Sequence, residues 1–449
     1  MSFELDKIYL QEIENLIEEG KWKALIEKVL DLHSADIAEI LDELNVEDAI
    51  AMYKCFPEER AAEIMVELDE DLQEKLVAEL SSKQIAEELI ENLDSDDAAD
   101  IIGALPEDRK VEVITQIEDI EQAKQIVDLL NYPEDTAGAL MAKELIKVNH
   151  NWSVLQCVRE MRRQAEEIDE VHAIYVVDDD NILLGTLSLK KLLTTTTKTP
   201  VKEVFNSKVR SVQANMNDEE LARLMQKYDL VVVPVVDELG RLLGRITIDD
   251  VMDVMREEAE KDYQLASGIS ESVESDDSVY RLTRARLPWL LIGLFGGVLG
   301  AQIIGLFEIK ENLEMAFFIP LIAAMGGNVG VQSSAIIVQA LANKTEKFQG
   351  LFARLMKELS VSILNGLVCS LIILGAVVGL GYDVILAITV SISLLLVIIF
   401  AALFGTFVPL TLSKYNIDPA VATGPFITTA NDMLGLFIYF SIGKILLGA

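Results

Sequence analysis

The sequence predicts a mixed fold in two parts. The first is an acidic cytoplasmic half that combines an α-solenoid domain with an α+β pair of modules, and the second is a domain of five transmembrane α-helices. The chain has 449 residues and a formal net charge of −36. The first 279 residues carry 66 acidic and 28 basic side chains, whereas the remainder carries 8 and 10. A helical repeat in the first part and five long apolar segments in the second complete the prediction.

Residues 1–136 repeat a short helical unit. A hydrophobic residue followed by a polar turn recurs every twelve residues, with one interval of thirteen, at Leu44, Phe56, Leu68, Leu80, Leu93, Leu105 and Ile117. The Ser, Asp or Pro in each turn is typical of a helix start, where acidic side chains oppose the helix dipole. Stacked units of this kind form an α-solenoid, so we expect an acidic helical-repeat N-domain.

Residues 137–255 contain an internal duplication. Each copy predicts a strand, an Asp-rich turn and a second strand beginning at Gly185 or Gly244, and each is preceded by a helix, at Val154–Gln164 and Glu219–Lys227. The duplication is similar to a tandem pair of cystathionine-β-synthase (CBS) modules, here about 137–199 and 200–255. Such a pair packs as one α+β disc and often binds adenine nucleotides.

The nucleotide signature of CBS modules is a Ser or Thr followed three residues later by Asp. Thr247 and Asp250 meet it in the second module, whereas Lys191 stands at the Asp position of the first. The resemblance therefore allows an ATP site in the second module and disfavours one in the first.

A charged connecting helix and linker are expected at 249–272. Its acidic residues are Asp249, Asp250, Asp253, Glu257, Glu258, Glu260 and Asp262. The position between the paired modules and the membrane half predicts that this helix couples the two mechanically.

The transmembrane domain, 280–449, holds five apolar segments at about 287–307, 316–342, 359–382, 384–412 and 420–447. Each is long enough to cross a bilayer. Basic residues flank alternate ends, among them Arg281, Lys344, Lys347 and Lys414. The positive-inside rule then predicts a multi-pass protein with a cytoplasmic N-terminus and an outside C-terminus.

Composition also limits the partners. Nucleic acid is excluded, because phosphate binding requires a basic surface, and divalent cations are favoured. The three cysteines, Cys55, Cys157 and Cys369, are widely spaced, which indicates a reducing compartment without a disulfide framework. The acidic N-terminus is unlike a signal peptide.

Asp432 is the principal candidate site residue. It lies roughly half-way along the last apolar segment, where a charge is costly unless it lines a hydrated path or is protonated and bonded between helices. Gly327, Asn328 and Gln332 add small and polar groups at similar depth in the second segment. Asp418 precedes the last segment at its cytoplasmic end, where an acid concentrates cations.

Three motifs resemble the signatures of bacterial MgtE-type magnesium transporters: Gly326-Gly-Asn-Val-Gly-Val-Gln-Ser333, Asp418-Pro-Ala420, and Gly424-Pro-Phe-Ile-Thr-Thr429 followed by Asp432. Together with the acidic helical N-domain, the paired CBS modules, the connecting helix and the five spans, the match covers nearly the whole chain. It implies a homodimeric Mg2+ channel of the bacterial cytoplasmic (inner) membrane, with its pore at the subunit interface. Asp432 and Asp418 are then the pore acids, and the implied pore lining is Gly327, Asn328, Gln332, Gly424, Pro425 and Thr428.

The resemblance also implies closure by intracellular Mg2+. The implied regulatory ligands are Asp96, Asp100, Glu219, Asp229, Asp250, Asp253 and Glu258. Two residues depart from the family pattern. Some relatives have an acid at the position of Lys261, and some have Asn at the position of Gly424. Our hypothesis is that acidic faces of the cytoplasmic half repel one another until Mg2+ bridges them, and that the connecting helix then blocks the pore.

Three other functions fit parts of the sequence. A gradient-coupled carrier of Mg2+ or Co2+ would use Asp432 equally, so the sequence does not separate carrier from channel. A CBS-regulated membrane enzyme lacks a histidine in any apolar segment, because His33, His150 and His172 all precede them. A pure Mg2+ sensor has no use for a mid-membrane acid.

Overall fold

The computed structural model describes residues 5–165, 168, 171–274, 277–307, 313–342, 351–415, 417–422 and 424–447. Lys344 and Lys347, which supported the predicted topology, lie outside these ranges. The chain divides into two compact units, residues 1–255 and 256–449. Each is treated by itself.

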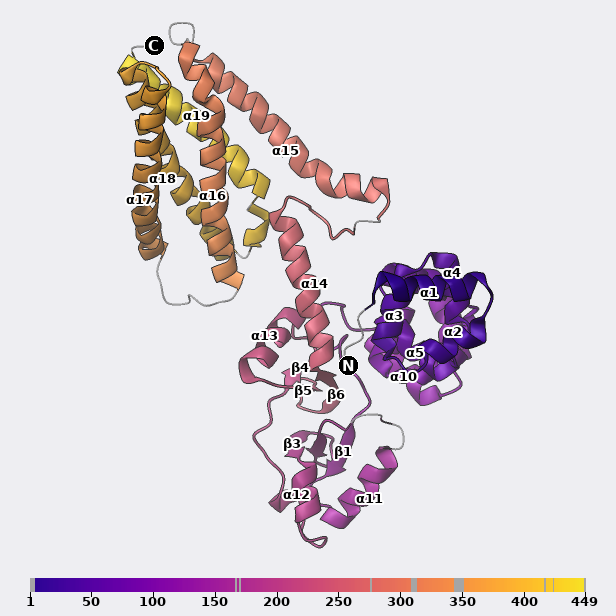
Figure 1. The fold of residues 1–449 in the computed structure, drawn as a ribbon. Coiled ribbons are helices and arrows are strands. Elements are labelled where there is room, and N and C mark those ends of the chain that lie inside the picture. The colour runs from indigo at the N-terminus through magenta and orange to yellow at the C-terminus, as the bar shows by residue number, and fades with distance from the viewer. Residues whose placement is uncertain are drawn as a thin grey trace. The chain divides into compact units, whose positions relative to one another are not determined.

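The N-domain is a run of short helices, drawn from indigo to purple in Figure 1. From α3 onward the helices begin at intervals close to twelve residues, as predicted. Of the repeated hydrophobic anchors, all but Leu93 are at most 9% exposed. The bounds are α1 (Lys7–Glu18), α2 (Trp22–Val29), α3 (Ser34–Glu43), α4 (Val46–Tyr53), α5 (Glu58–Glu67), α6 (Glu70–Glu79), α7 (Ser82–Gln84), η1 (Ile85–Leu89), η2 (Ile90–Asn92), α8 (Ser95–Gly103), α9 (Glu107–Gln116) and α10 (Ile120–Leu129).

Two three-stranded sheets form the paired modules. In each, the first strand pairs in parallel with the second, and the second pairs antiparallel with the third. This confirms the predicted α+β pair. The first module contains β1 (Ile146–Asn149), α11 (Val154–Gln164), β2 (Ile174–Val177), β3 (Leu183–Leu187), α12 (Leu189–Thr194) and η3 (Val201–Glu203), and the second contains β4 (Val212–Gln213), α13 (Asp218–Tyr228), β5 (Val232–Val236) and β6 (Leu242–Thr247).

Gly185 and Gly244 lie inside β3 and β6, so the prediction that the strands begin at them was wrong by two residues. Both glycines mark a close approach of a neighbouring backbone. A Cβ on Gly185 would lie 2.1 Å from the carbonyl oxygen of Asn206, and one on Gly244 would lie 2.6 Å from that of Ala142.

The segment that follows α10 packs on the second module, although in sequence it precedes the first. Ala137 and Gly138 donate backbone hydrogen bonds to Met216 and Ala214, and Ala142 forms an antiparallel bridge with Arg245. N-domain residues and second-module residues, such as Val233 and Ile246, share one hydrophobic core. The N-domain is thereby packed against the second module.

The second unit is a helical bundle of α15 (Val279–Gly305), α16 (Ile319–Ala342), α17 (Leu351–Gly379), α18 (Val384–Lys414) and α19 (Gly424–Leu447), with η5 (Leu313–Phe318) and η6 (Pro419–Ala422) before α16 and α19. All five long helices can cross a membrane by length and composition, which confirms the predicted transmembrane domain. α18 packs against α16, α17 and α19, whereas α15 packs mainly on α19 and is otherwise largely exposed (Figure 1). α14 (Ile248–Ala266) begins directly after β6 and ends in the second unit.

Candidate functional site

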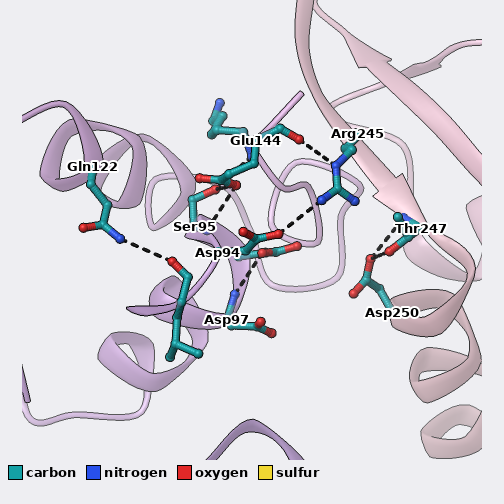
Figure 2. Close-up of polar contacts among 11 residues, drawn as sticks. Asp94, Ser95, Asp97, Gln122, Glu144, Arg245, Thr247 and Asp250 are labelled. Atoms are coloured by element: carbon teal, nitrogen blue, oxygen red, sulfur yellow. Dashed lines mark hydrogen bonds and ion pairs between the residues drawn. The ribbon is translucent and has the colours of Figure 1, made fainter. Parts of the chain in front are cut away.

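An acid cluster forms where the N-domain meets the second CBS module. We define it as the carboxylates of Asp94, Asp96, Asp97, Glu144 and Asp250. Asp94 is the N-cap residue of α8, Asp96 and Asp97 lie in the first turn of α8, and Asp250 lies in the first turn of α14. Glu144 comes from the segment between α10 and β1. The guanidinium of Arg245, from β6, projects into the group (Figure 2).

Three members could hold one metal ion. One carboxylate oxygen from each of Asp94, Asp96 and Glu144 lies within 4.8 Å of the other two, and all three residues are half-buried. The N–H and Oγ of Ser95 donate to Glu144 Oε2 at 3.2 and 2.8 Å, which holds this carboxylate against α8. Carboxylate oxygens are the ligands that Mg2+ prefers.

Electrostatics in the cluster favour binding a cation or a proton. Burial, together with the charges of Asp97 and Asp250, raises the pKa of Asp96 well above its usual value. Burial and the charge of Asp250 raise the pKa of Asp97 to about 7. Burial also raises the pKa of Asp250. The charged form of each of these three carboxylates is therefore destabilised by burial and by neighbouring negative charges. A bound divalent cation would offset this destabilisation.

Asp250 was predicted both as part of the nucleotide signature and as a regulatory Mg2+ ligand. Its Oδ2 accepts hydrogen bonds from the N–H and Oγ1 of Thr247, at 3.1 and 2.8 Å, so the two residues of the nucleotide signature bind each other. Its charge also acts on Asp96 and Asp97. The structure thus brings the predicted regulatory residues Asp96 and Asp250 together, and Asp100, one turn along α8, acts on Asp97.

The remaining predicted regulatory residues lie elsewhere on their elements. Glu219 forms an ion pair with Arg223 on α13, and Asp229 is exposed at the end of that helix. Asp253 is exposed on α14. Glu258 accepts from the Lys261 ammonium at 2.9 Å, so the departure at Lys261 places a cation on this carboxylate.

Sequence reasoning missed Asp94, Asp97, Glu144 and Arg245. A signal for Arg245 was present, because it is a lone charge in the strand Leu242-Leu-Gly-Arg-Ile-Thr247. Glu144 carried no such signal, since only the fold brings it to α8.

In the membrane unit, Asp432 lies close to the backbone of Gly327. A Cβ on Gly327 would lie 3.0 Å from the methyl carbon of Thr428 and 3.4 Å from Asp432 Oδ1. The structure therefore brings together Gly327, Thr428 and Asp432 from α16 and α19. Asn328 and Gln332 are exposed one helical turn apart on α16.

The start of α19 contacts the end of α14. A Cβ on Gly424 would lie 2.4 Å from the carbonyl oxygen of Ala266, and one on Gly268 would lie 2.5 Å from Pro425 Cγ. Asp418 is exposed before this point, and its Oδ1 accepts from the N–H of Ala420 at 2.8 Å. The predicted pore residues Gly424 and Pro425 therefore contact the end of the connecting helix and the linker that follows it.

Asn431 is a membrane residue that sequence reasoning missed. It is 1% exposed, and neither polar atom of its amide has a hydrogen-bond partner among the described residues. Its Nδ2 occupies the space that a side chain on Gly330 would take. The missing side chain of Gly330 therefore accommodates an amide where α16 and α19 meet.

Comparisons with known proteins agree with this organisation. A family model described as "MgtE intracellular N domain" matches residues 32–135, the CBS domain model matches 137–196 and 201–257, and a model described as "Divalent cation transporter" (MgtE) matches 319–442. The acid cluster and Asp432 fall within these ranges, whereas Glu258, Ala266 and Gly268 of the connecting helix and linker lie between them.

Whole-chain relatives are similar along most of their length. The chain is 33% identical to the magnesium transporter MgtE of Thermus thermophilus over 97% of this chain and 98% of the relative. It is 35% identical to the magnesium transporter MgtE of Bacillus subtilis over 70% of each. A crystal structure of the cytosolic domain of the Mg2+ channel MgtE in complex with ATP has a TM-score of 0.51 at 35% identity, and covers 55% of this chain and 99% of that one.

Proposed function

Because the chain belongs to the MgtE family of magnesium transporters, we propose that it is a Mg2+-selective channel whose pore lies at a homodimer interface and is closed by intracellular Mg2+. The observation that carries the transport proposal is the half-buried carboxylate of Asp432 beside Gly327 in a membrane-spanning helix. A charge at this depth is retained where it serves an ion path.

Hydration explains why one acid per subunit suffices. Mg2+ dehydrates reluctantly and usually keeps several waters while it binds one or two carboxylates. Two Asp432 side chains related by a two-fold axis would hold a largely hydrated ion. Gly327 lets α16 approach this carboxylate closely, since a Cβ there would lie 3.4 Å from Asp432 Oδ1. Exposed Asn328 and Gln332 add polar atoms to the path, and Asp418 attracts cations at its cytoplasmic mouth.

Gating is proposed to start at the acid cluster. Mg2+ binds Asp94, Asp96 and Glu144 and offsets the repulsion between these buried carboxylates and their acidic neighbours. Asp250 of this cluster lies in the first turn of α14, and the end of α14 touches Gly424 at the start of the pore helix. One continuous helix therefore links the ion-binding residues to the pore entrance. Asp100, Glu219, Asp229, Asp253 and Glu258 are retained as further regulatory ligands.

Orientation and nucleotide binding are proposed on separate grounds. Arg281, Arg284 and Arg286 at the start of α15 favour a cytoplasmic N-terminus in the bacterial cytoplasmic membrane, and five spans then place the C-terminus outside. ATP is proposed to bind near Thr247 and Asp250 of the second module, by analogy with the ATP complex of the similar cytosolic domain.

Mg2+ uptake in a strain that lacks other Mg2+ uptake systems tests the transport proposal. Asp432→Ala and Asp432→Asn should both abolish uptake, whereas Asp383→Asn, an acid at the start of α18, should leave it unchanged. Uptake by both Asp432 variants at the wild-type rate would remove Asp432 from the pore.

A further inference from the structure

Glu358 is an acid on the face of α17 that packs inside the membrane unit. Buried residues lie at intervals of four on either side of it, at Arg354, Ser362, Gly366 and Ser370. Residues four apart share one face of a helix. Glu358 itself is half-buried and immediately precedes the apolar segment 359–382. A carboxylate in this position requires a partner within the protein.

This face of α17 contacts two different helices along its length. Near the middle of α17 it packs on α18, where the Ser370 hydroxyl donates to the carbonyl oxygen of Ser391 at 2.8 Å. About three turns earlier the same face reaches α16, where the Ser333 hydroxyl donates to Glu358 Oε1 at 2.6 Å. Hydrogen bonds from a hydroxyl to an ionised carboxylate are typically about 2.5–2.7 Å long. Glu358 therefore ties α17 directly to α16.

Ser333 lies on the buried face of α16, next to the residues proposed to line the pore. It is 5% exposed, whereas Asn328 and Gln332 are exposed on a different face of the same helix. The buried face also meets α18, because a Cβ on Gly405 would lie 2.3 Å from the carbonyl oxygen of Gly330. Consecutive residues of an α-helix are about 100° apart around its axis. A rotation of α16 that displaces Ser333 therefore also displaces Gln332.

We propose that Glu358 is a positioning residue for the ion path: its carboxylate fixes Ser333 and thereby the rotation of α16, which orients Asn328 and Gln332 toward the passing ion. This inference rests on the pore lining of the proposed function. Polar groups that bind the waters of a hydrated Mg2+ act only at hydrogen-bond distance, so a small rotation weakens binding of the ion. Loss of the carboxylate would also leave the Ser333 hydroxyl buried without its acceptor.

The concentration dependence of Mg2+ uptake tests this inference, in a strain that lacks other Mg2+ uptake systems. Glu358→Leu and Ser333→Ala should each raise the half-saturating Mg2+ concentration several-fold. The double variant should be no worse than the more affected single variant, because both changes remove one shared hydrogen bond. Glu358→Gln keeps an acceptor oxygen and should recover most of the wild-type value. Ser360→Ala is the matched control and should equal wild type, because it removes an exposed hydroxyl that bonds to the Met356 carbonyl within α17.

The half-saturating concentration separates positioning from folding. A variant that only destabilises the bundle lowers the amount of protein in the membrane and the maximal rate, but not the affinity of the path for the ion. The proposal is overturned if either Glu358→Leu or Ser333→Ala leaves the half-saturating concentration unchanged, or if their effects add in the double variant. Ser333→Ala removes a single oxygen atom and carries the test alone if Glu358→Leu fails to reach the membrane.

Gln332→Ala separates this inference from the pore lining on which it rests. If Gln332→Ala raises the half-saturating concentration and Glu358→Leu does not, the lining stands and Glu358 does not position it. If Gln332→Ala leaves that concentration unchanged, the lining itself is wrong and the role of Glu358 falls with it.

Discussion

Gly424 lies against the backbone of Ala266: a Cβ at Gly424 would come within 2.4 Å of the Ala266 carbonyl oxygen. This contact joins the last residue of α14 to the first residue of α19. A glycine at this position lets the two helix ends meet without an intervening side chain. The departure from Asn at this position, noted from the sequence, therefore has a packing consequence.

Gly424→Ala should weaken closure. The added methyl cannot fit without moving the Ala266 backbone, so the end of α14 should lose its contact with α19. We expect Mg2+ uptake to continue at internal Mg2+ concentrations that stop the wild type, measured with an intracellular Mg2+ dye. Gly293→Ala on α15 is the matched control, because a Cβ there meets nothing within 4 Å. Normal closure in Gly424→Ala would show that this contact does not support the closed state.

Gly327→Val should reduce transport by narrowing the space beside Asp432. Its methyl groups would crowd the Thr428 methyl and the Asp432 carboxylate. We expect a several-fold fall in the Mg2+ uptake rate at unchanged protein level in the membrane. Thr428→Ser removes the crowded methyl and should recover part of the rate in the double variant. An undiminished rate in Gly327→Val would place the ion path elsewhere.

The pKa of Asp97, raised to about 7, predicts a pH dependence of stability without divalent cations. The folded state binds a proton more tightly than the unfolded state, in which the pKa is about 4. The protonated group therefore contributes its full stabilisation below pH ~4, and this contribution is lost as pH rises through about 7. In EDTA, the unfolding temperature of the first unit, residues 1–255, should fall by a few degrees between pH 6 and 8.

Two controls accompany this pH experiment. Asp97→Asn should flatten the pH dependence, because the replaced side chain does not titrate. Mg2+ should raise the unfolding temperature more at pH 8 than at pH 6, because it competes with the proton for the cluster. A wild-type unfolding temperature that rises with pH in EDTA would contradict the assigned environment of Asp97.

Much of the fold could be predicted from local patterns. The twelve-residue repeat, the duplicated strand pattern and the five apolar segments each rest on short-range periodicity, and the structure confirms all three. The predicted starts of β3 and β6 were wrong, because Gly185 and Gly244 were interpreted as the first residues of these strands. In the structure each glycine marks a place where another backbone approaches.

The candidate site could be predicted only in part. Asp432 stands out as an acid in an apolar segment, whereas Asp96 and Asp250 were predicted from the family resemblance. Glu144 and Arg245 meet Asp94 only because the segment after α10 crosses the second module, a long-range arrangement that no periodicity carries. Asn431 was overlooked because its exceptional feature, a buried amide at Gly330 without a hydrogen-bond partner in the described part of the chain, depends on helix packing.

We propose that intracellular Mg2+ binds the acid cluster and thereby closes a pore through Asp432. Single-channel recording from inside-out patches tests this mechanism. The proteins to compare are the wild type, the cluster variant Asp96→Asn/Asp250→Asn and a control variant, Asp36→Asn/Asp108→Asn. The control removes the same number of first-turn acids, from α3 and α9. We predict unitary Mg2+ currents that millimolar-range Mg2+ on the cytoplasmic face suppresses in wild type and control but not in the cluster variant. Equal suppression in all three proteins would show that Mg2+ at the acid cluster does not close the pore. Saturating tracer uptake without unitary currents would show that the protein is a carrier and not a channel.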